Sequence, residues 1–195
     1  MTEPRIADHP IDPHMLERWS PRSFDDSTLS QADLDTLFEA ARWAPSAFNH
    51  QPWRFAYALR GDAHWDDYVS ALLPFNAGWA SKASALVFVL SDTLILAPGK
   101  TEPQPATTAS FDAGAAWALL ALQATKLGLS THAMAGFDHA RANEVTGAGE
   151  RYKVEAAVAV GRRGDVAALP EALQAREAPS GRLTVAEISF HGKRG

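Results

Sequence analysis

Hydrophobic residues recur with two different spacings along the chain. After Ser30 they return every three or four positions until Pro45, which predicts a helix ending near Trp43. Short runs rich in β-branched and aromatic residues instead predict strands. By these criteria strands are expected at 53–59, 86–90, 131–134 and 154–160, and further helices at 14–19, 63–73, 76–83, 109–127 and 138–145.

Capping residues support several of these boundaries. Asp12 followed by Pro13 is typical of a helix start, and Ser30 with Asp33 resembles a capping box. Gly128 is placed to end the longest helix. Residues 94–107, which include three prolines, are expected to form a loop, and residues 182–190 a last strand or an extended arm.

Strands and helices do not alternate strictly, so the expected class is α+β, with a small central sheet packed among helices. The length of 195 residues suits one domain spanning 1–195. The segment 109–127 is apolar on nearly every face. A helix of this kind is buried on all sides, either in the core or against a second subunit.

Composition narrows the functional classes. No apolar run approaches the roughly 20 residues of a membrane span, and residues 1–12 lack the pattern of a signal peptide. Cysteine is absent, which excludes disulfides and thiol chemistry and fits a cytoplasmic location. The net charge of −5 argues against a general nucleic-acid binder. Basic residues cluster at 18–22, 162–163 and 193–194, where they indicate either a small anionic ligand or solvated surface charge; charge alone favours the latter.

Two segments carry the candidate chemistry. The first is Arg18-Trp19-Ser20-Pro21-Arg22, in which two guanidinium groups and a hydroxyl could grip a phosphate, although surface stretches of this type are common. The second runs from Ala44 to Trp53 and gathers Ser46, Asn49, His50 and Gln51 between prolines and aromatics. Amide side chains suit the edge of a heteroaromatic ring. An ordinary helix-to-strand connection would explain the prolines and serine, but not this density of amides and aromatics.

Together the two segments resemble the N-terminal signature of the nitroreductase family, an Arg-x-Ser-x-Arg motif followed by Ala-Pro-Ser-x-x-Asn-x-Gln-Pro-Trp. The resemblance extends to Asn76 before a buried strand, to the Leu-Gly-Leu turn after the long helix and to the Gly136-Phe137-Asp138 turn. It covers about residues 16–195.

The resemblance implies an interlocked homodimer with FMN at the interface, a mainly antiparallel sheet and reduction by NADH or NADPH. Arg18 and Ser20, flanking Trp19, would hold the FMN phosphate, with Lys193 and Arg194 completing that site. Arg22 would lie at the pyrimidine end of the flavin. The partner chain would cover the flavin with a loop formed by Pro45, Ser46, Ala47, Asn49 and Gln51.

The remaining implied contacts come from the middle of the chain. Asn76 would bond the ring edge or the ribityl chain, and the N–H of Gly136 would point at the reactive ring nitrogen. Some members have an acidic residue where this chain has Ala135, so only a backbone contact is expected there. His191 is an alternative phosphate partner.

Other chemistries receive less support. No grouping of His, Asp and Glu has metal-ligand spacing, so no metal is expected. Ser46 has no nucleophile-elbow context, which argues against hydrolysis. His50 is expected either to touch substrate or to face solvent, and His132 to be a core residue.

The expected activity is ping-pong hydride transfer from NAD(P)H through FMN to a nitroaromatic, quinone or activated alkene. Two alternatives are a flavin-binding or sensory protein without turnover, and a specialised relative that performs dehalogenation, flavin destruction or azoline oxidation. Acceptor choice is expected to depend on residues 63–73 and 94–107.

Overall fold

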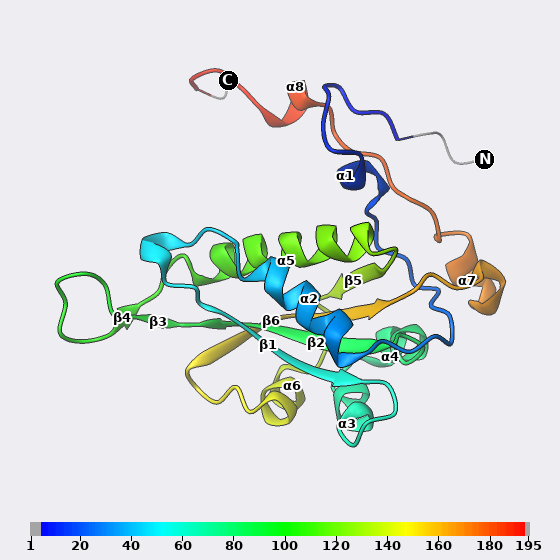
Figure 1. Ribbon diagram of the computed structural model, residues 1–195, viewed down its shortest axis with the longest axis horizontal. Helices are drawn as coiled ribbons and strands as arrows, with labels where there is room; N and C mark the ends of the chain where they lie inside the picture. The colour runs from blue at the N-terminus through cyan, green and yellow to red at the C-terminus, as the bar shows by residue number, and fades with distance from the viewer. Residues whose placement is uncertain (1–4, 194–195) are drawn as a thin grey trace.

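A four-stranded antiparallel sheet lies at the centre of the structure, a computed structural model that describes residues 5–193 (Figure 1). The strand order is β1-β2-β6-β5, and every neighbouring pair is antiparallel. The bounds are β1 Trp53–Leu59, β2 Ala85–Asp92, β5 Ser130–Met134 and β6 Tyr152–Gly161. The predicted α+β class with a mainly antiparallel sheet is therefore confirmed.

Strand β2 occupies the interior of the sheet and is buried at all of its positions. It pairs with β1 on one side and β6 on the other, so that Phe88 stands opposite Ala56 and Ala157. Helices cover both faces of the sheet, and both faces of this strand therefore require apolar side chains. This burial explains why the strand appears in the sequence as an unbroken hydrophobic run.

The helices form two layers around the sheet (Figure 1). Helices α2 (Gln31–Ala41) and α5 (Ala109–Lys126) cover one face, and α3 (Trp65–Ser70) and α6 (His139–Thr146) cover the other. Each face has its own apolar core. The first core contains Leu34, Leu37, Val87, Ala116, Leu120 and Val158, and the second contains Trp65, Tyr68, Trp79, Phe88, Met134 and Phe137.

Local capping explains where several helices begin and end. The Asp12 side chain accepts a hydrogen bond from the His14 N–H at 2.9 Å, which starts α1 (Pro13–Glu17). Ser30 and Asp33 form the reciprocal capping box of α2. After α5 the chain turns at Gly128, whose φ of +71° is costly for other residues. The boundaries that these residues predicted are thus confirmed to within a turn.

Several segments differ from the sequence-based expectations. Helix α3 is shorter than predicted, and α4 (Pro74–Ala80) begins earlier because a proline occupies its first turn. The expected loop at 94–107 contains a small hairpin, β3 (Leu94–Ile95) and β4 (Gln104–Pro105). Two short helical segments, η2 (Val166–Ala168) and α7 (Glu171–Gln174), were not predicted, because elements of three or four residues are too short to show periodicity.

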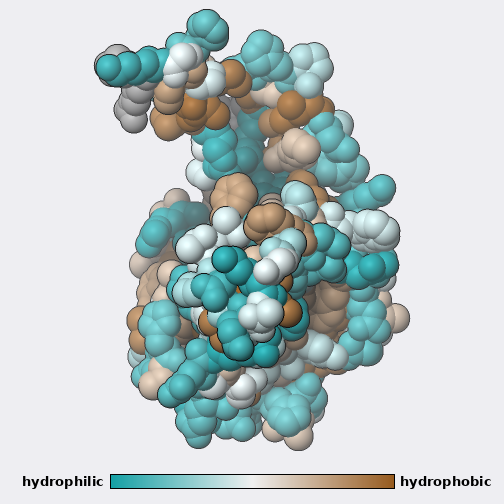
Figure 2. Space-filling view, turned by 90° about the vertical axis from the view of Figure 1, so that its left-hand side faces the viewer, coloured by the Kyte–Doolittle hydropathy of each residue, from teal (hydrophilic) through white to brown (hydrophobic). Residues whose placement is uncertain are grey.

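The C-terminal segment forms no strand within the described chain. It contains the short helix α8 (Val185–Ile188), started by a capping box of Thr184 and Glu187, and the rest of it is an exposed arm. The arm meets the N-terminal segment, since the Val185 N–H donates to the Asp8 carboxylate at 2.7 Å. Figure 2 shows these two terminal segments standing away from the body of the molecule, with hydrophobic side chains among them.

One ion pair fastens the end of β2 and yields a pH-dependent prediction. The buried Asp92 carboxylate accepts hydrogen bonds from Arg151 at 2.7 and 3.0 Å. Burial alone would raise the pKa of Asp92, but the bonds from Arg151 and the Leu94 N–H outweigh it and lower this pKa. The resulting stabilisation is complete above pH about 4, the ordinary Asp range, and is lost as the pH falls through the lowered native pKa.

Asp92→Asn is therefore expected to lower the free energy of unfolding by about 1–2 kcal/mol at pH 7, a modest value because Arg151 is exposed. The difference from wild type should shrink as the pH falls below about 4. Urea unfolding at pH 7 and pH 3, at one protein concentration, measures both values. The exposed Glu102→Gln serves as the matched control and should change neither value. Equal losses at both pH values would show that the Asp92 charge is not the stabilising element.

Candidate functional site

The Arg18–Arg22 segment follows α1 as extended backbone and bends at Arg22. The Arg18 guanidinium lies 3.4 Å from the Ser20 hydroxyl, so the two predicted phosphate ligands are neighbours. Trp19, between them, is half-buried. His132 of β5 holds the backbone of this segment in place, because its Nδ1 lies 3.0 Å from the Pro21 carbonyl oxygen. Since a carbonyl only accepts, this His132 nitrogen carries the proton.

His132 contacts the Arg18–Arg22 segment from the interior of the fold. Burial lowers its pKa, and the nearby Arg22 charge lowers it further against the opposing carbonyl contacts. Its ring packs against Trp79 with centroids 4.6 Å apart. The prediction that His132 is a core residue agrees with this environment.

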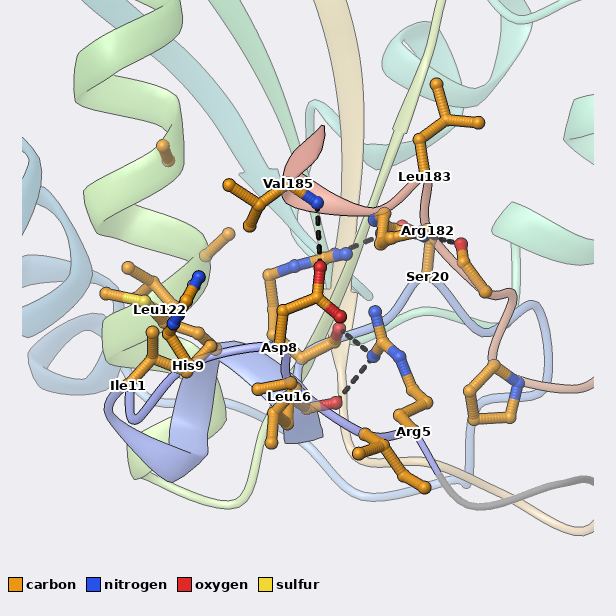
Figure 3. Close-up of a pocket in the computed structure, with 18 of the residues that line it drawn as sticks. Arg5, Asp8, His9, Ile11, Leu16, Ser20, Leu122, Arg182, Leu183 and Val185 are labelled. Carbon is orange, nitrogen blue, oxygen red and sulfur yellow. Dashed lines mark hydrogen bonds between the residues drawn. The ribbon is translucent and has the colours of Figure 1, made fainter. Parts of the chain in front are cut away.

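A groove of about 1030 Å³ opens beside Arg18 and Ser20, between α5 and the two terminal segments (Figure 3). Its α5 wall is largely apolar and includes Trp117, Ala121 and Leu122. The rest of the lining carries Arg5, Arg18, Ser20 and Arg182 among apolar residues such as Ile6 and Leu183. The groove therefore combines an apolar surface with a cluster of guanidinium groups.

The cations in this groove are crowded. Burial, followed by the charges of Arg182 and Arg5, lowers the pKa of Arg18. Arg5 donates to the carbonyl oxygens of Leu16 and Arg18 at 2.5 and 2.8 Å. These bonds fix the Arg5 guanidinium near those of Arg18 and Arg182. Asp8 is the acidic residue among those lining the groove, and it already accepts the Val185 N–H. An anion bound here would relieve the repulsion, and arginine forks suit a phosphate.

Sequence reasoning missed Arg182. A single arginine in an arm of mixed polarity gave no signal, whereas the basic pair at the end of the chain did. Lys193 is exposed beyond α8 and is not among the residues that line the groove. Arg194 lies outside the described residues. Within the described chain, Arg182 is the basic residue of the C-terminal segment that lies beside Arg18.

Asn76 and Gly136, two further residues of the predicted site, meet where α4 lies against the segment after β5. Asn76 Nδ2 donates to the Gly136 carbonyl at 2.9 Å, and the Leu73 N–H donates to the same oxygen at 3.1 Å. A Cβ at position 136 would lie 2.5 Å from Asn76 Nδ2, so only glycine permits this approach. The neighbouring Ala135 side chain is exposed and makes no comparable contact.

Gly136→Ala is expected to push the Asn76 amide out of place. A contact of 2.5 Å is too close for any Cβ, so either the side chain or the turn must move. If Asn76 helps to bind a flavin, as proposed below, FMN affinity should fall about tenfold, the value of one lost hydrogen bond. Fluorescence titration of FMN measures it. Gly78→Ala is the control, because Gly78 lies on α4 with Asn76 and its new Cβ would have no atom within 4 Å. This variant should leave the FMN affinity unchanged.

The amide-rich loop, residues 45–52, lies at the start of α5. It includes the short helical turn η1 (Ala47–Asn49), and the Ala47 N–H donates to the buried Asp112 of α5 at 3.2 Å. The Ser46 hydroxyl accepts the Gln51 N–H at 2.9 Å. Phe48, Asn49 and Gln51 all have φ between 51° and 53°, a left-handed conformation unusual for these residues.

Within one described chain the loop does not join the rest of the site. None of its residues lines the groove, and Pro45, Phe48, Asn49 and Gln51 are exposed. The structure therefore brings together Arg18, Ser20 and Arg182, and separately Asn76 and Gly136, but leaves the loop facing outward.

Two further findings concern the described residues. No group of three or more His, Asp or Glu side chains in residues 5–193 is arranged to hold a metal ion. None of the helices described combines the length and hydropathy that crossing a membrane requires.

Comparison with known proteins places this geometry in a family. Residues 15–162 match the model of the nitroreductase family. A crystal structure described as an oxidoreductase containing FMN is 44% identical and superposes with a TM-score of 0.93, covering 99% of this chain and 97% of that one. The chain belongs to the nitroreductase family.

Two curated relatives are similar over shorter stretches. An uncharacterised 15.4 kDa protein of Mycolicibacterium smegmatis is 37% identical over 128 residues, which cover 65% of this chain and 82% of the relative. An oxygen-insensitive NADPH nitroreductase of Helicobacter acinonychis (strain Sheeba) is 38% identical over 76 residues. That match spans 38% of this chain and 35% of the relative.

Proposed function

We propose that this chain is an FMN-dependent oxidoreductase that transfers a hydride from NADH or NADPH to a small acceptor such as a nitroaromatic, a quinone or an activated alkene. The observation that carries the proposal is the cationic groove formed by Arg18, Ser20 and Arg182. Family membership supports it, as does the FMN in the oxidoreductase that is 44% identical. The name of the Helicobacter relative supports a nicotinamide donor.

The residues present fit FMN. Arg18, Ser20 and Arg182 would hold the phosphate. Arg22 would lie at the pyrimidine end, and its buried Nε has no hydrogen-bond partner among the described residues, which leaves it a donor for a ligand. Asn76 and the Gly136 N–H would contact the ring.

When bound, FMN would supply the two-electron redox chemistry that links the nicotinamide to the acceptor. Arg22 contributes a fixed cation, which stabilises the negative charge that arises at the pyrimidine end on reduction. No side chain need act as acid or base in the hydride step. Donor and acceptor would use the same open face in turn, which gives ping-pong kinetics.

We further propose that two chains form the site. Large apolar side chains are exposed on the arm and on or just after α1, α2 and α5, among them Met15, Trp43, Phe111 (81% exposed), Leu127 and Ile188. An apolar area of this kind marks an interface, and a second copy would cover it. The loop that includes Pro45, Ser46, Ala47, Asn49 and Gln51 would then cover the flavin of the partner.

The decisive experiment is a reductive half-reaction. The purified protein should be yellow, lose its 450-nm-region absorbance on anaerobic mixing with NADH or NADPH, and recover it with p-benzoquinone or a nitroaromatic. A protein that cannot be loaded with FMN would contradict the proposal. FMN binding without reduction by either nicotinamide would instead indicate a flavin-binding protein without turnover.

A further inference from the structure

Glu177 is a buried acidic residue with no part in the proposed hydride step. It follows α7, and its side chain has no exposed surface. Oε1 accepts two backbone hydrogen bonds, from the Arg22 N–H at 2.6 Å and from the Ser23 N–H at 2.9 Å. Buried carboxylates require such donors, because they have lost their hydration. These bonds join residues more than 150 positions apart and fix the backbone that carries Arg22.

The second oxygen of Glu177 is related to Arg22 in a different way. Oε2 lies 3.8 Å from Arg22 Nη1, which is an ion pair without a hydrogen bond. Neither Oε2 nor Arg22 Nε has a hydrogen-bond partner among the described residues, although both atoms are buried. Glu177 therefore offsets the charge of Arg22 while leaving its N–H donors available for a ligand.

We propose that Glu177 is a positioning residue that holds Arg22 in place and moderates its positive charge, and thereby sets the reduction potential of the flavin. The inference rests on the proposed function, in which Arg22 lies at the pyrimidine end. A cation there favours the reduced flavin, and a carboxylate beside the cation weakens that effect. Glu177 thus keeps the bound flavin more strongly reducing than Arg22 alone would allow.

The test is the midpoint potential of the FMN-loaded protein, measured by spectroelectrochemical titration. Glu177→Gln keeps an oxygen that can accept both N–H bonds and removes the charge. The oxidised–reduced equilibrium should shift about tenfold toward the reduced form, a rise of about 30 mV for a two-electron couple. Glu171→Gln, an exposed substitution on α7, the helix that precedes Glu177, is the control and should leave the potential unchanged.

An unchanged or lower potential in Glu177→Gln overturns the inference. A merely structural role for Glu177 predicts weaker FMN binding without a higher potential, which a fluorescence titration of FMN affinity distinguishes. If Glu177→Gln does not fold, Arg22→Gln is compared with the double variant Arg22→Gln/Glu177→Gln. The double variant should have the higher potential, and equal potentials or loss of FMN from both variants contradict the inference.

The two proposals fail in different ways. A wild-type chain that binds no FMN contradicts the proposed function and this inference together. A wild-type chain that binds and reduces FMN, with an unchanged potential in Glu177→Gln, contradicts this inference alone.

Discussion

Replacement of Arg18 and Arg182 together by glutamine is expected to give a protein that purifies without colour. Both guanidinium groups line the groove beside Ser20, where the FMN phosphate is proposed to bind. A hydrogen bond to a charged group contributes about 1.5–3 kcal/mol, so losing two should weaken FMN binding about 1000-fold or more. Quenching of FMN fluorescence by the apoprotein measures the dissociation constant.

The same substitution should not unfold the chain. The charge of Arg182 adds to burial in lowering the pKa of Arg18, which means that the two cations repel each other when no anion is bound. Urea unfolding of the apoprotein should therefore show equal or greater stability than wild type. Lys193→Gln is the matched comparison, and its FMN affinity should match that of wild type. If Lys193→Gln weakens binding as much as Arg182→Gln, the phosphate site lies at the end of the chain instead.

Ala118→Glu is expected to abolish dimer formation and, with it, tight FMN binding. Ala118 is exposed on α5 and lines the groove, so a single chain can accommodate the larger side chain in solvent. A longer, charged side chain placed in a close-packed interface costs several kcal/mol in steric strain and desolvation, enough to weaken association about 100-fold or more. Sedimentation velocity over a range of protein concentrations measures the association.

Ala140→Glu provides the control for this experiment. Ala140 is exposed on α6, on the opposite face of the sheet, and receives the same change in size, charge and helix propensity. It should sediment as wild type and retain FMN. If Ala118→Glu also remains an FMN-loaded dimer, the face of α5 around the groove is not the subunit interface.

The long elements of this fold were predictable from spacing alone. The strands at 53–59, 86–90 and 154–160 and the helices around α2 and α5 all lie close to their predicted places. Burial of both faces gave β2 its continuous apolar run, and capping residues marked the starts of α1 and α2. The short elements η2, α7 and α8 could not be found in this way, because their positions depend on tertiary contacts rather than on periodicity.

The motifs singled out residues that do meet in the folded chain, since Arg18 lies beside Ser20 and Asn76 beside Gly136. Their roles toward a ligand stay predictions. Arg182 and Glu177 carried no signal, because Arg182 comes close to Arg18, and Glu177 to Arg22, only after the chain has folded. Spacing along the sequence cannot report a contact between residues more than 150 positions apart.

The left-handed residues of the loop at 45–52 have a consequence for ligand binding. Phe48, Asn49 and Gln51 each hold a conformation that costs about 1 kcal/mol or more for residues other than glycine, and contacts to Ser46 and Asp112 maintain it. The loop is thus preorganised. Its conformational entropy is lost when the chain folds, and little remains to be lost when a flat ligand is covered. We expect the loop to act as a rigid cover rather than as a closing lid.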